Sequence, residues 1–477
     1  MSILKSHSEK DKISKCEDCY SIAVLLTLCS RNCTIDSIDN IPFLKILYPS
    51  LVRNLPKNIR LTFFVGYDDD DVFYDMHAGI LRERGFNVYK LYHCQHAPAK
   101  AWNKIFNIAY YDSKTFDYFL QIGDDVEMEH DWVTTFIDKL KENGDLGIVG
   151  PCEPVNYYQR MNSGGSWIIE NAFVSRTHFH IFKTFFHPTI KNWFCDNWIT
   201  DVYRPQYAHI FTDIKCKNTV RDQRYTVAFP DNLEKYIQEG KEKVQNFIDG
   251  KRVKVFSFCI YGHELKYCQG LLENILLIQE HYPDFEVWIY GGFDVPIEYV
   301  EKYQSYPCVR YIELPLNDIR LMYHRFMPID DPYVDICFIR DADSRIYGRD
   351  QWCIQKFLES SKTLHIIRDH PWHAQRIMGG MWGIKKEFMT NCPEEIREMY
   401  HKWLKGHQKE WLEYRGDQYF LSNCIYTRIE DNELIHSNYN FFRDEKLNSI
   451  EYPDTPNEFV GNAYTYEDGK LKAIFSK

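Results

Sequence analysis

Apolar runs recur in the same order in the two halves of the chain. The first half opens with the run Ile22–Cys29 and the second half with the run Val253–Ile260. Runs of this length are typical of strands that are buried in a sheet. A polar turn and then a stretch with helical spacing of its apolar residues follow each run. We therefore predict that each half begins with a strand and a helix.

Two further predicted strands follow in each half. The second ends at Val65-Gly-Tyr-Asp68 in the first half and at Ile289–Asp294 in the second, where glycine permits a sharp exit into a loop. The third strands, Tyr118–Asp125 and Ile336–Asp343, both finish in paired aspartates at similar offsets from the opening strand. This repeated order of features indicates that the two halves of the chain have the same type of fold.

Strands that alternate with helical stretches predict an α/β fold with mostly parallel sheets. In such folds ligands bind at the carboxyl ends of the strands, where the aspartates fall. We predict an N-terminal tail over residues 1–20 and two tandem domains over 21–230 and 253–477. Residues 231–252 are rich in Lys and Glu but place apolar residues at helical spacing, which predicts a helical linker.

Composition narrows the class of protein. Lys and Arg total 57 against 68 Asp and Glu, and this formal charge of −11 repels nucleic acid. The 44% of apolar residues indicates a globular protein, and the 16% of aromatic residues is high, as in many sugar-binding surfaces. No apolar run approaches the length of a membrane span or a signal-peptide core. We expect a cytoplasmic protein, in the host cytoplasm or the virion if it is viral.

Fifteen cysteines are spread without the spacing of a disulfide framework. Several lie inside apolar runs, which favours buried thiols in a reducing compartment. Cys16 and Cys19 could form a zinc site with Cys29 or Cys33, but no second C-x-x-C supports that alternative.

An acidic pair at a strand end has two interpretations. Aspartates are common in turns and at helix N-termini. Two carboxylates one residue apart can also bind a divalent cation that holds a diphosphate. Two such pairs, each after an apolar strand and at similar offsets, favour the second interpretation.

Asp124-Asp125-Val-Glu127 and Asp341-Ala-Asp343 resemble the D-x-D motifs of glycosyltransferases with the GT-A fold, a Rossmann-like α/β fold. The resemblance implies that a nucleotide-sugar, most often a UDP-sugar, lies across the strand ends. It also implies Mn²⁺ or Mg²⁺ on the diphosphate, acting as a Lewis acid. The first motif is not a clean D-x-D, so its metal pair is either Asp125 with Glu127 or Asp124 with Asp125. In the second half the implied ligands are Asp341 and Asp343, with His436 as a further ligand or else a surface histidine.

In the first half, Lys100-Ala-Trp-Asn103 is similar to the donor-contacting helix of such enzymes, although it also fits an ordinary helix start. Segment 171–178 is expected to be a strand that lines the site, and segment 218–225 to close over the diphosphate. The resemblance implies a catalytic base in the acidic helix start at residues 193–204, with Asp196 as first choice and Asp201 as second; Asp196 also suits a helix N-cap. The expected donor contacts are Thr27, Arg31, Asp68, Lys100, Asn103 and Asp124.

In the second half, the segments 340–345, 367–373 and 378–383 together resemble bacterial and large-DNA-virus, mimivirus-like glycosyltransferases. Asp417-Gln418 is similar to the helix start of the retaining, glycogenin-like branch, which implies a catalytic Asp417. The glycine pair also fits a tight turn beside a core tryptophan, and Arg325 also fits a solvated helix face. The expected donor contacts are Arg325, Arg340, Arg368, Asp369, His370, Gly379 and Gly380.

The resulting hypothesis is a bifunctional, metal-dependent glycosyltransferase that transfers sugars from nucleotide-sugars to a growing glycan, with an inverting first half and a retaining second half. One alternative has a single catalytic domain beside a glycan- or donor-binding module. Another is a phosphohydrolase with an aspartyl nucleophile, but such enzymes usually carry the nucleophile on the first strand. A third is a glycan-binding protein without enzymatic activity.

Overall fold

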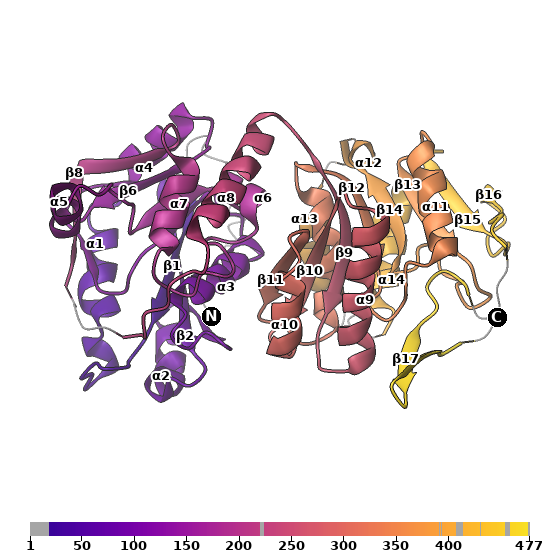
Figure 1. Ribbon diagram of the computed structural model, residues 1–477, viewed down its shortest axis with the longest axis horizontal. Coiled ribbons are helices and arrows are strands. Elements are labelled where there is room, and N and C mark those ends of the chain that lie inside the picture. Colours follow the sequence, from indigo (N-terminus) through magenta and orange to yellow (C-terminus); the bar gives the residue numbers. More distant parts are fainter. Residues whose placement is uncertain are drawn as a thin grey trace, which may run out of the picture.

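The computed structural model describes residues 19–219, 224–390, 392, 394–406, 414–429, 431–453 and 458–475. Residues 1–18 of the predicted tail, Cys16 of the zinc alternative and residues 220–223 of the predicted closing segment lie outside this part. Two α/β halves lie side by side, with the first in indigo to magenta and the second in orange to yellow (Figure 1). None of the helices in the described ranges combines the length and apolar character that crossing a membrane requires.

The first sheet has the strand order β3-β2-β1-β4-β7-β6-β8-β5. β1 pairs in parallel with β2 and β4, and β7 is antiparallel to both β4 and β6. The strands are β1 Tyr20–Leu28, β2 Ile59–Asp68, β3 Asn87–Leu91, β4 Tyr118–Gln121, β5 Val126–Met128, β6 Ile148–Cys152, β7 Ala172–Ser175 and β8 Ala208–Asn218.

The second sheet repeats this design in the order β11-β10-β9-β12-β14-β13-β15-β16. β9 pairs in parallel with β10 and β12, and β14 is antiparallel to β12 and β13. Counted from β3 and from β11, the first seven strands of the two sheets therefore match in order and direction. The predicted α/β fold with two mostly parallel sheets is confirmed. The strands are β9 Val253–Ile260, β10 Phe285–Gly292, β11 Val309–Leu314, β12 Val334–Arg340, β13 Leu364–Arg368, β14 Met381–Lys385, β15 Glu433–Ser437 and β16 Leu447–Asn448; β17 Tyr464–Glu467 and β18 Lys470–Ala473 form a separate antiparallel pair.

Both faces of the first sheet are covered. In β1 the residues Ile22, Val24 and Leu26 belong to one apolar cluster, whereas Ala23 and Leu25 belong to another. Because successive side chains of a strand point to opposite faces, a run that is apolar throughout requires a core on each side. The helices of this half are α1 Tyr48–Val52, α2 Val72–Glu83, α3 Pro98–Tyr110, α4 Val133–Glu142, α5 Pro154–Asn162, α6 Arg176–Phe182 and α7 Cys195–Tyr203, with short turns η1 Ile38–Asn40 and η2 Phe43–Leu47.

The predicted linker contains a helix, α8 (Leu233–Ile248), which buries Ile237 and Val244. It packs on α7, and the Trp198 indole donates a 2.9 Å hydrogen bond to the Tyr236 carbonyl. The residue boundaries of the two domains stay a prediction. The helices that follow are α9 Leu265–His281, α10 Ile297–Gln304, α11 Gly348–Glu359, α12 Lys386–Thr390, α13 Ile396–Gly406 and α14 Gly416–Phe420, with the turns η3 Ile319–Asp330, η5 Leu421–Ile425 and η6 Tyr426–Arg428.

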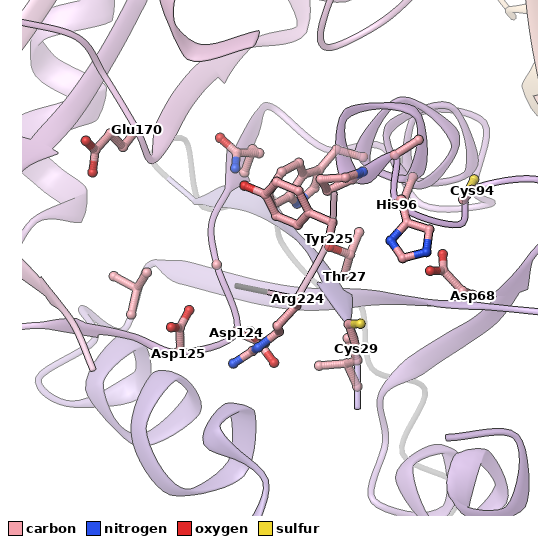
Figure 2. A pocket seen from close by; sticks show the side chains of 18 of the residues that line it. Thr27, Cys29, Asp68, Cys94, His96, Asp124, Asp125, Glu170, Arg224 and Tyr225 are labelled. Carbon is pink, nitrogen blue, oxygen red and sulfur yellow. Dashed lines mark hydrogen bonds and ion pairs between the residues drawn. The ribbon is translucent and has the colours of Figure 1, made fainter. Parts of the chain in front are cut away.

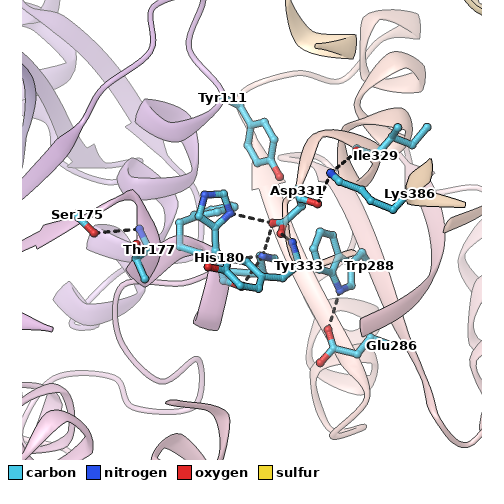
Figure 3. Close-up of polar contacts among 12 residues, drawn as sticks. Tyr111, Ser175, Thr177, His180, Glu286, Trp288, Ile329, Asp331, Tyr333 and Lys386 are labelled. Atoms are coloured by element: carbon cyan, nitrogen blue, oxygen red, sulfur yellow. Dashed lines mark hydrogen bonds and ion pairs between the residues drawn. The ribbon is translucent and has the colours of Figure 1, made fainter. Parts of the chain in front are cut away.

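Buried polar contacts join the two halves (Figure 3). Asp331, at the end of η3, accepts hydrogen bonds from His180 Nδ1 at 3.1 Å and Lys183 Nζ at 2.7 Å, both from the first half. Burial acts to raise the pKa of the Asp331 carboxyl, but the charges of Lys183 and His180 outweigh it and hold that pKa well below its usual range. The Arg397 guanidinium of α13 also donates to the Tyr110 carbonyl at 3.1 Å. The halves therefore meet through specific charges.

Asp331→Asn should lower the free energy of unfolding by about 3 kcal/mol, because it leaves Lys183 buried without its anion. Urea unfolding followed by circular dichroism measures the change. The control is Asp284→Asn, which breaks an exposed ion pair of the same 2.7 Å length with Lys254 and should change the stability by no more than about 0.5 kcal/mol. Equal losses in the two variants would contradict the role of the buried pair.

Candidate functional site

A cavity of about 550 Å³ opens where the strands β1, β2 and β4 of the first sheet end. The amino ends of α3 and α7 and the segment after β8 complete its walls. The carboxyl edge of an open α/β sheet is where such folds bind ligands, and the volume is typical of a small-molecule site. Of the residues that the D-x-D resemblance assigned to the first-half site, Thr27, Arg31, Asp68, Asp124, Asp125 and Asp196 line the cavity.

Asp124 and Asp125 follow β4 and lie at one side of the cavity, next to Arg224 (Figure 2). Asp124 Oδ1 accepts a 2.7 Å hydrogen bond from Arg224 Nη1, while Asp124 Oδ2 is buried and has no hydrogen-bond partner in the part of the chain that the structure describes. Burial raises the pKa of Asp124 to about 6, with Arg224 acting against the rise and Asp125 adding to it. A buried carboxylate oxygen of this kind is a suitable ligand for a cation.

Glu170 lines the same cavity and was missed by the sequence analysis. Its two carboxylate oxygens each accept a 3.0 Å hydrogen bond from the Asn156 side-chain amide. Burial raises the pKa of Glu170 to about 7; the bond from Asn156 acts against the rise, and the charge of Asp196 adds to it. One signal in the sequence could have identified Glu170. It comes directly before segment 171–178, which contains β7 and was expected to line the site.

Asp196 lies in the first turn of α7 and accepts a 3.0 Å hydrogen bond from the Cys195 thiol. Burial raises the pKa of this carboxyl as well. Glu170 and Asp196 are therefore two carboxyl groups of one cavity that hold their protons more tightly than usual. A carboxylate whose pKa is raised is a stronger base, which suits it to accept a proton from a hydroxyl group.

Arg31 and Asp68 line the cavity at the ends of β1 and β2, and they bind each other through a 2.6 Å ion pair. Arg31 also forms an ion pair with Asp70. Burial raises the pKa of Asp68, and Arg31 acts against that rise. The positive charge of Arg31 is thus shared between two carboxylates of the chain.

Four residues predicted for the first-half site do not line the cavity. Asn103 is buried, and its amide donates to the Phe186 carbonyl at 3.0 Å and accepts from the Phe186 N–H at 2.7 Å. Asn103 and Lys100 both line a separate space of about 50 Å³ at the junction of the halves. Asp201 of α7 forms a 2.6 Å ion pair with Arg204, the residue after this helix, and Glu127 lies opposite Lys217 in the β5–β8 pair.

In the second half, the Arg325 cluster consists of Arg325, Asp341 and Asp417. The Arg325 guanidinium donates one hydrogen bond to Asp341 Oδ1 and another, 2.8 Å long, to Asp417 Oδ2. Gly379 and Gly380 pack directly against these carboxylates, since a side-chain carbon at either glycine would collide with one of them. Asp343 lies nearby, and its burial together with the charge of Asp341 raises the pKa of its carboxyl to about 6.

The other residues predicted for the second-half site have different partners. Arg340 binds both oxygens of Asp350 at 2.8 Å, and the Asp369 carboxylate binds the Arg349 guanidinium. His436 Nδ1 lies 2.8 Å from His365 Nε2, and burial lowers the pKa of His436 to about 4, so this imidazole is neutral. Two further contacts are an ion pair from Arg368 to Glu445 and a stacked ring pair of His370 with Phe459.

In the described residues, neither candidate metal site has a full set of side-chain ligands for a metal ion. In the described ranges, no group of three or more His, Cys, Asp or Glu side chains is placed so that it could hold a metal ion, and this includes Cys19, Cys29 and Cys33 of the zinc alternative. Asp124 and Asp125 still fit the manner in which Mg²⁺ and similar ions bind, through one or two carboxylates together with phosphate oxygens and water. The observation that supports metal binding here is Asp124 Oδ2, which is buried and has no hydrogen-bond partner among the described residues.

No protein-family model and no curated protein matches the sequence. Among solved structures, a glycosyltransferase involved in glycosylation of the major capsid of PBCV-1 is 13% identical, with a TM-score of 0.28 over 39% of this chain and 82% of that one. A 4-diphosphocytidyl-2C-methyl-D-erythritol synthase from Anaerococcus prevotii is 12% identical, with a TM-score of 0.28 over 40% and 88%. A mannosyltransferase from Pyrobaculum calidifontis, in complex with GDP-Man and Mn²⁺, is 14% identical, with a TM-score of 0.24 over 30% and 46%. Each similarity covers less than half of this chain.

The raised pKa of Glu170 predicts a pH dependence of stability. Between its ordinary value of about 4.5 and its folded value of about 7, the unfolded chain releases this proton while the folded chain keeps it, so stability falls as the pH rises. Glu170→Gln should reduce that fall, as measured by urea unfolding at pH 5 and pH 7.5. The control Glu142→Gln changes an exposed residue and should keep the pH dependence of the wild type. If Glu170→Gln keeps it as well, the raised pKa of Glu170 is contradicted.

Proposed function

We propose that the first half is a glycosyltransferase that uses a nucleotide-sugar donor, with a UDP-sugar as the first candidate and a glycan as acceptor. The observation that carries this proposal is a cavity at the strand ends with two kinds of carboxyl group. Asp124 and Asp125 stand beside the cation Arg224, while Glu170 and Asp196 hold their protons tightly. The D-x-D resemblance of Asp124-Asp125-Val-Glu127 supports the same donor class.

On the donor side, the residues present suit a diphosphate. Arg224 supplies a fixed positive charge, and Asp124 with Asp125 would hold Mn²⁺ or Mg²⁺. When bound, the metal ion would neutralise charge on the departing nucleoside diphosphate. Arg224 would contribute to the same neutralisation through its own positive charge.

On the acceptor side, the pair Glu170 and Asp196 would receive the proton. The acceptor hydroxyl oxygen forms a bond to the anomeric carbon of the donor, the bond from that carbon to the diphosphate oxygen breaks, and the diphosphate leaves with the electron pair. The hydroxyl proton passes to one of the two carboxylates. Asp196 keeps its place as a candidate base, and Glu170, which Asn156 holds through both oxygens, is the second. A base on the face opposite to the leaving group gives an inverting enzyme.

For the second half we propose a role in binding donor or glycan beside this catalytic half. Asp417, the residue expected to act in a retaining reaction, has its carboxylate held by Arg325, and so has Asp341. This favours the alternative with one catalytic domain over two active domains. It also disfavours the phosphohydrolase, since Asp341 is held by Arg325 and follows β12, which is not the first strand of its sheet along the chain.

The test is transfer activity with a panel of nucleotide-sugars, glycan acceptors and Mn²⁺, in parallel with donor binding by calorimetry. Asp125→Asn should weaken metal-dependent donor binding. Loss of the base should lower kcat by about 10²- to 10⁴-fold while donor affinity stays within about twofold. Failure of every nucleotide-sugar to bind the wild-type chain would sink the proposal.

The pH profile identifies the base. If Glu170 accepts the proton, kcat/KM should fall as the pH drops below about 7, because the protonated carboxyl cannot act as a base. This acidic limb should disappear in Glu170→Gln and remain in the exposed control Glu142→Gln. If the limb survives in Glu170→Gln and activity is lost in Asp196→Asn, Asp196 is the base.

A further inference from the structure

A single buried guanidinium joins three separate elements of the second half. Arg325 lies in η3, Asp341 follows β12, and Asp417 lies in the first turn of α14. Arg325 is 1% exposed, and its two terminal nitrogens each donate to a different carboxylate. One permanent positive charge therefore binds two carboxylates at the carboxyl end of β12, and the cluster as a whole stays negative when both are ionised.

The chain between β13 and β14 fits tightly around this cluster. A side-chain carbon at Gly379 would collide with Asp417 Oδ2 and lie 2.7 Å from Arg325 Nη2. A side-chain carbon at Gly380 would lie 2.5 Å from Asp341 Oδ1 and still closer to Asp341 Oδ2, and both distances are too short. Only glycine fits at both positions while Asp341, Asp417 and Arg325 are arranged in this way. The glycine pair and the Arg325 cluster therefore fit each other.

The first half places its charges differently. Arg224 donates through Nη1 to Asp124, and among the described residues Asp124 Oδ2 has no hydrogen-bond partner beside the cavity of about 550 Å³. Of the three second-half aspartates, two are bound by Arg325, and Asp343 has no ion pair within the described part of the chain. A divalent cation requires several oxygen ligands that are not already bound by another cation.

We propose that Arg325 takes the place of a divalent metal ion in the second half, so that this half has no metal site of its own. The guanidinium cannot release its proton in the physiological range, so it stays a cation whatever the solvent supplies. A divalent ion that approached Asp341 and Asp343 would meet a fixed positive charge on Asp341. The second half would then bind its ligand without a divalent ion, whereas the first half, on the proposed function, requires one.

The test counts Mn²⁺ bound to the full-length chain, from the electron paramagnetic resonance signal of the free ion. Asp343→Asn should leave the wild-type count unchanged. Arg325→Met should add an Mn²⁺ per chain, because it removes the fixed positive charge from Asp341, so that Asp341 and Asp343 can bind an ion together with water. The double variant Arg325→Met with Asp343→Asn should lose this added ion.

Arg325→Lys is the matched control, because it keeps a positive charge and should add no ion. Loss of a bound Mn²⁺ in Asp343→Asn, or failure of a folded Arg325→Met chain to gain one, would overturn the proposal. If thermal unfolding shows that Arg325→Met does not fold, the comparison of Asp343→Asn with wild type decides alone. Asp125→Asn reports separately on the first half: if it leaves the Mn²⁺ count unchanged, the proposed donor site there fails while the inference on Arg325 stands.

Discussion

A buried carboxylate needs a nearby positive charge, because burial otherwise favours its neutral form. This requirement recurs at the edge of each sheet and at the junction of the two halves. Arg224 meets it for Asp124, Arg325 meets it for Asp341, and Lys183 meets it for Asp331 between the halves. The three cations come from different elements, so the positions of the loops, of η3 and of α6 all depend on the same electrostatic condition.

The two halves show how one topology can support different chemistry. Their sheets agree in strand order and direction over seven positions, and both place aspartates after the fourth strand of the shared design. In the first half Arg224 binds one oxygen of Asp124, and the other oxygen has no partner among the described residues; in the second half Arg325 bridges two carboxylates. The difference lies in side chains on loops and short helices, where α/β folds vary their function.

The strands and the acidic pairs could be predicted from the sequence, because burial on both faces requires continuous apolar runs such as Ile22–Cys29. The partners of the charged residues could not. Arg325 and Asp417 are 92 positions apart, and only the assembled fold brings them together. Asn103 looked like a donor contact but satisfies the backbone of Phe186, and Glu170 has no local motif that marks it. Local pattern thus located the strand ends, while long-range packing decided which side chains face the cavity.

Helix α3 links the cavity to the second half. Ala97 and Pro98 at its start, with Ala101 and Trp102 in its first turns, form one wall of the cavity. One turn on, Lys104 forms a 2.6 Å ion pair with Glu313 of β11. At its other end, the Tyr110 carbonyl accepts the bond from Arg397, and the hydroxyl of the following Tyr111 lies 3.1 Å from that of Tyr290. Because a helix moves as a rigid element, a displacement of the second half would act on the same helix that shapes the cavity of the first half. The second half therefore helps to fix the position of one wall of this cavity.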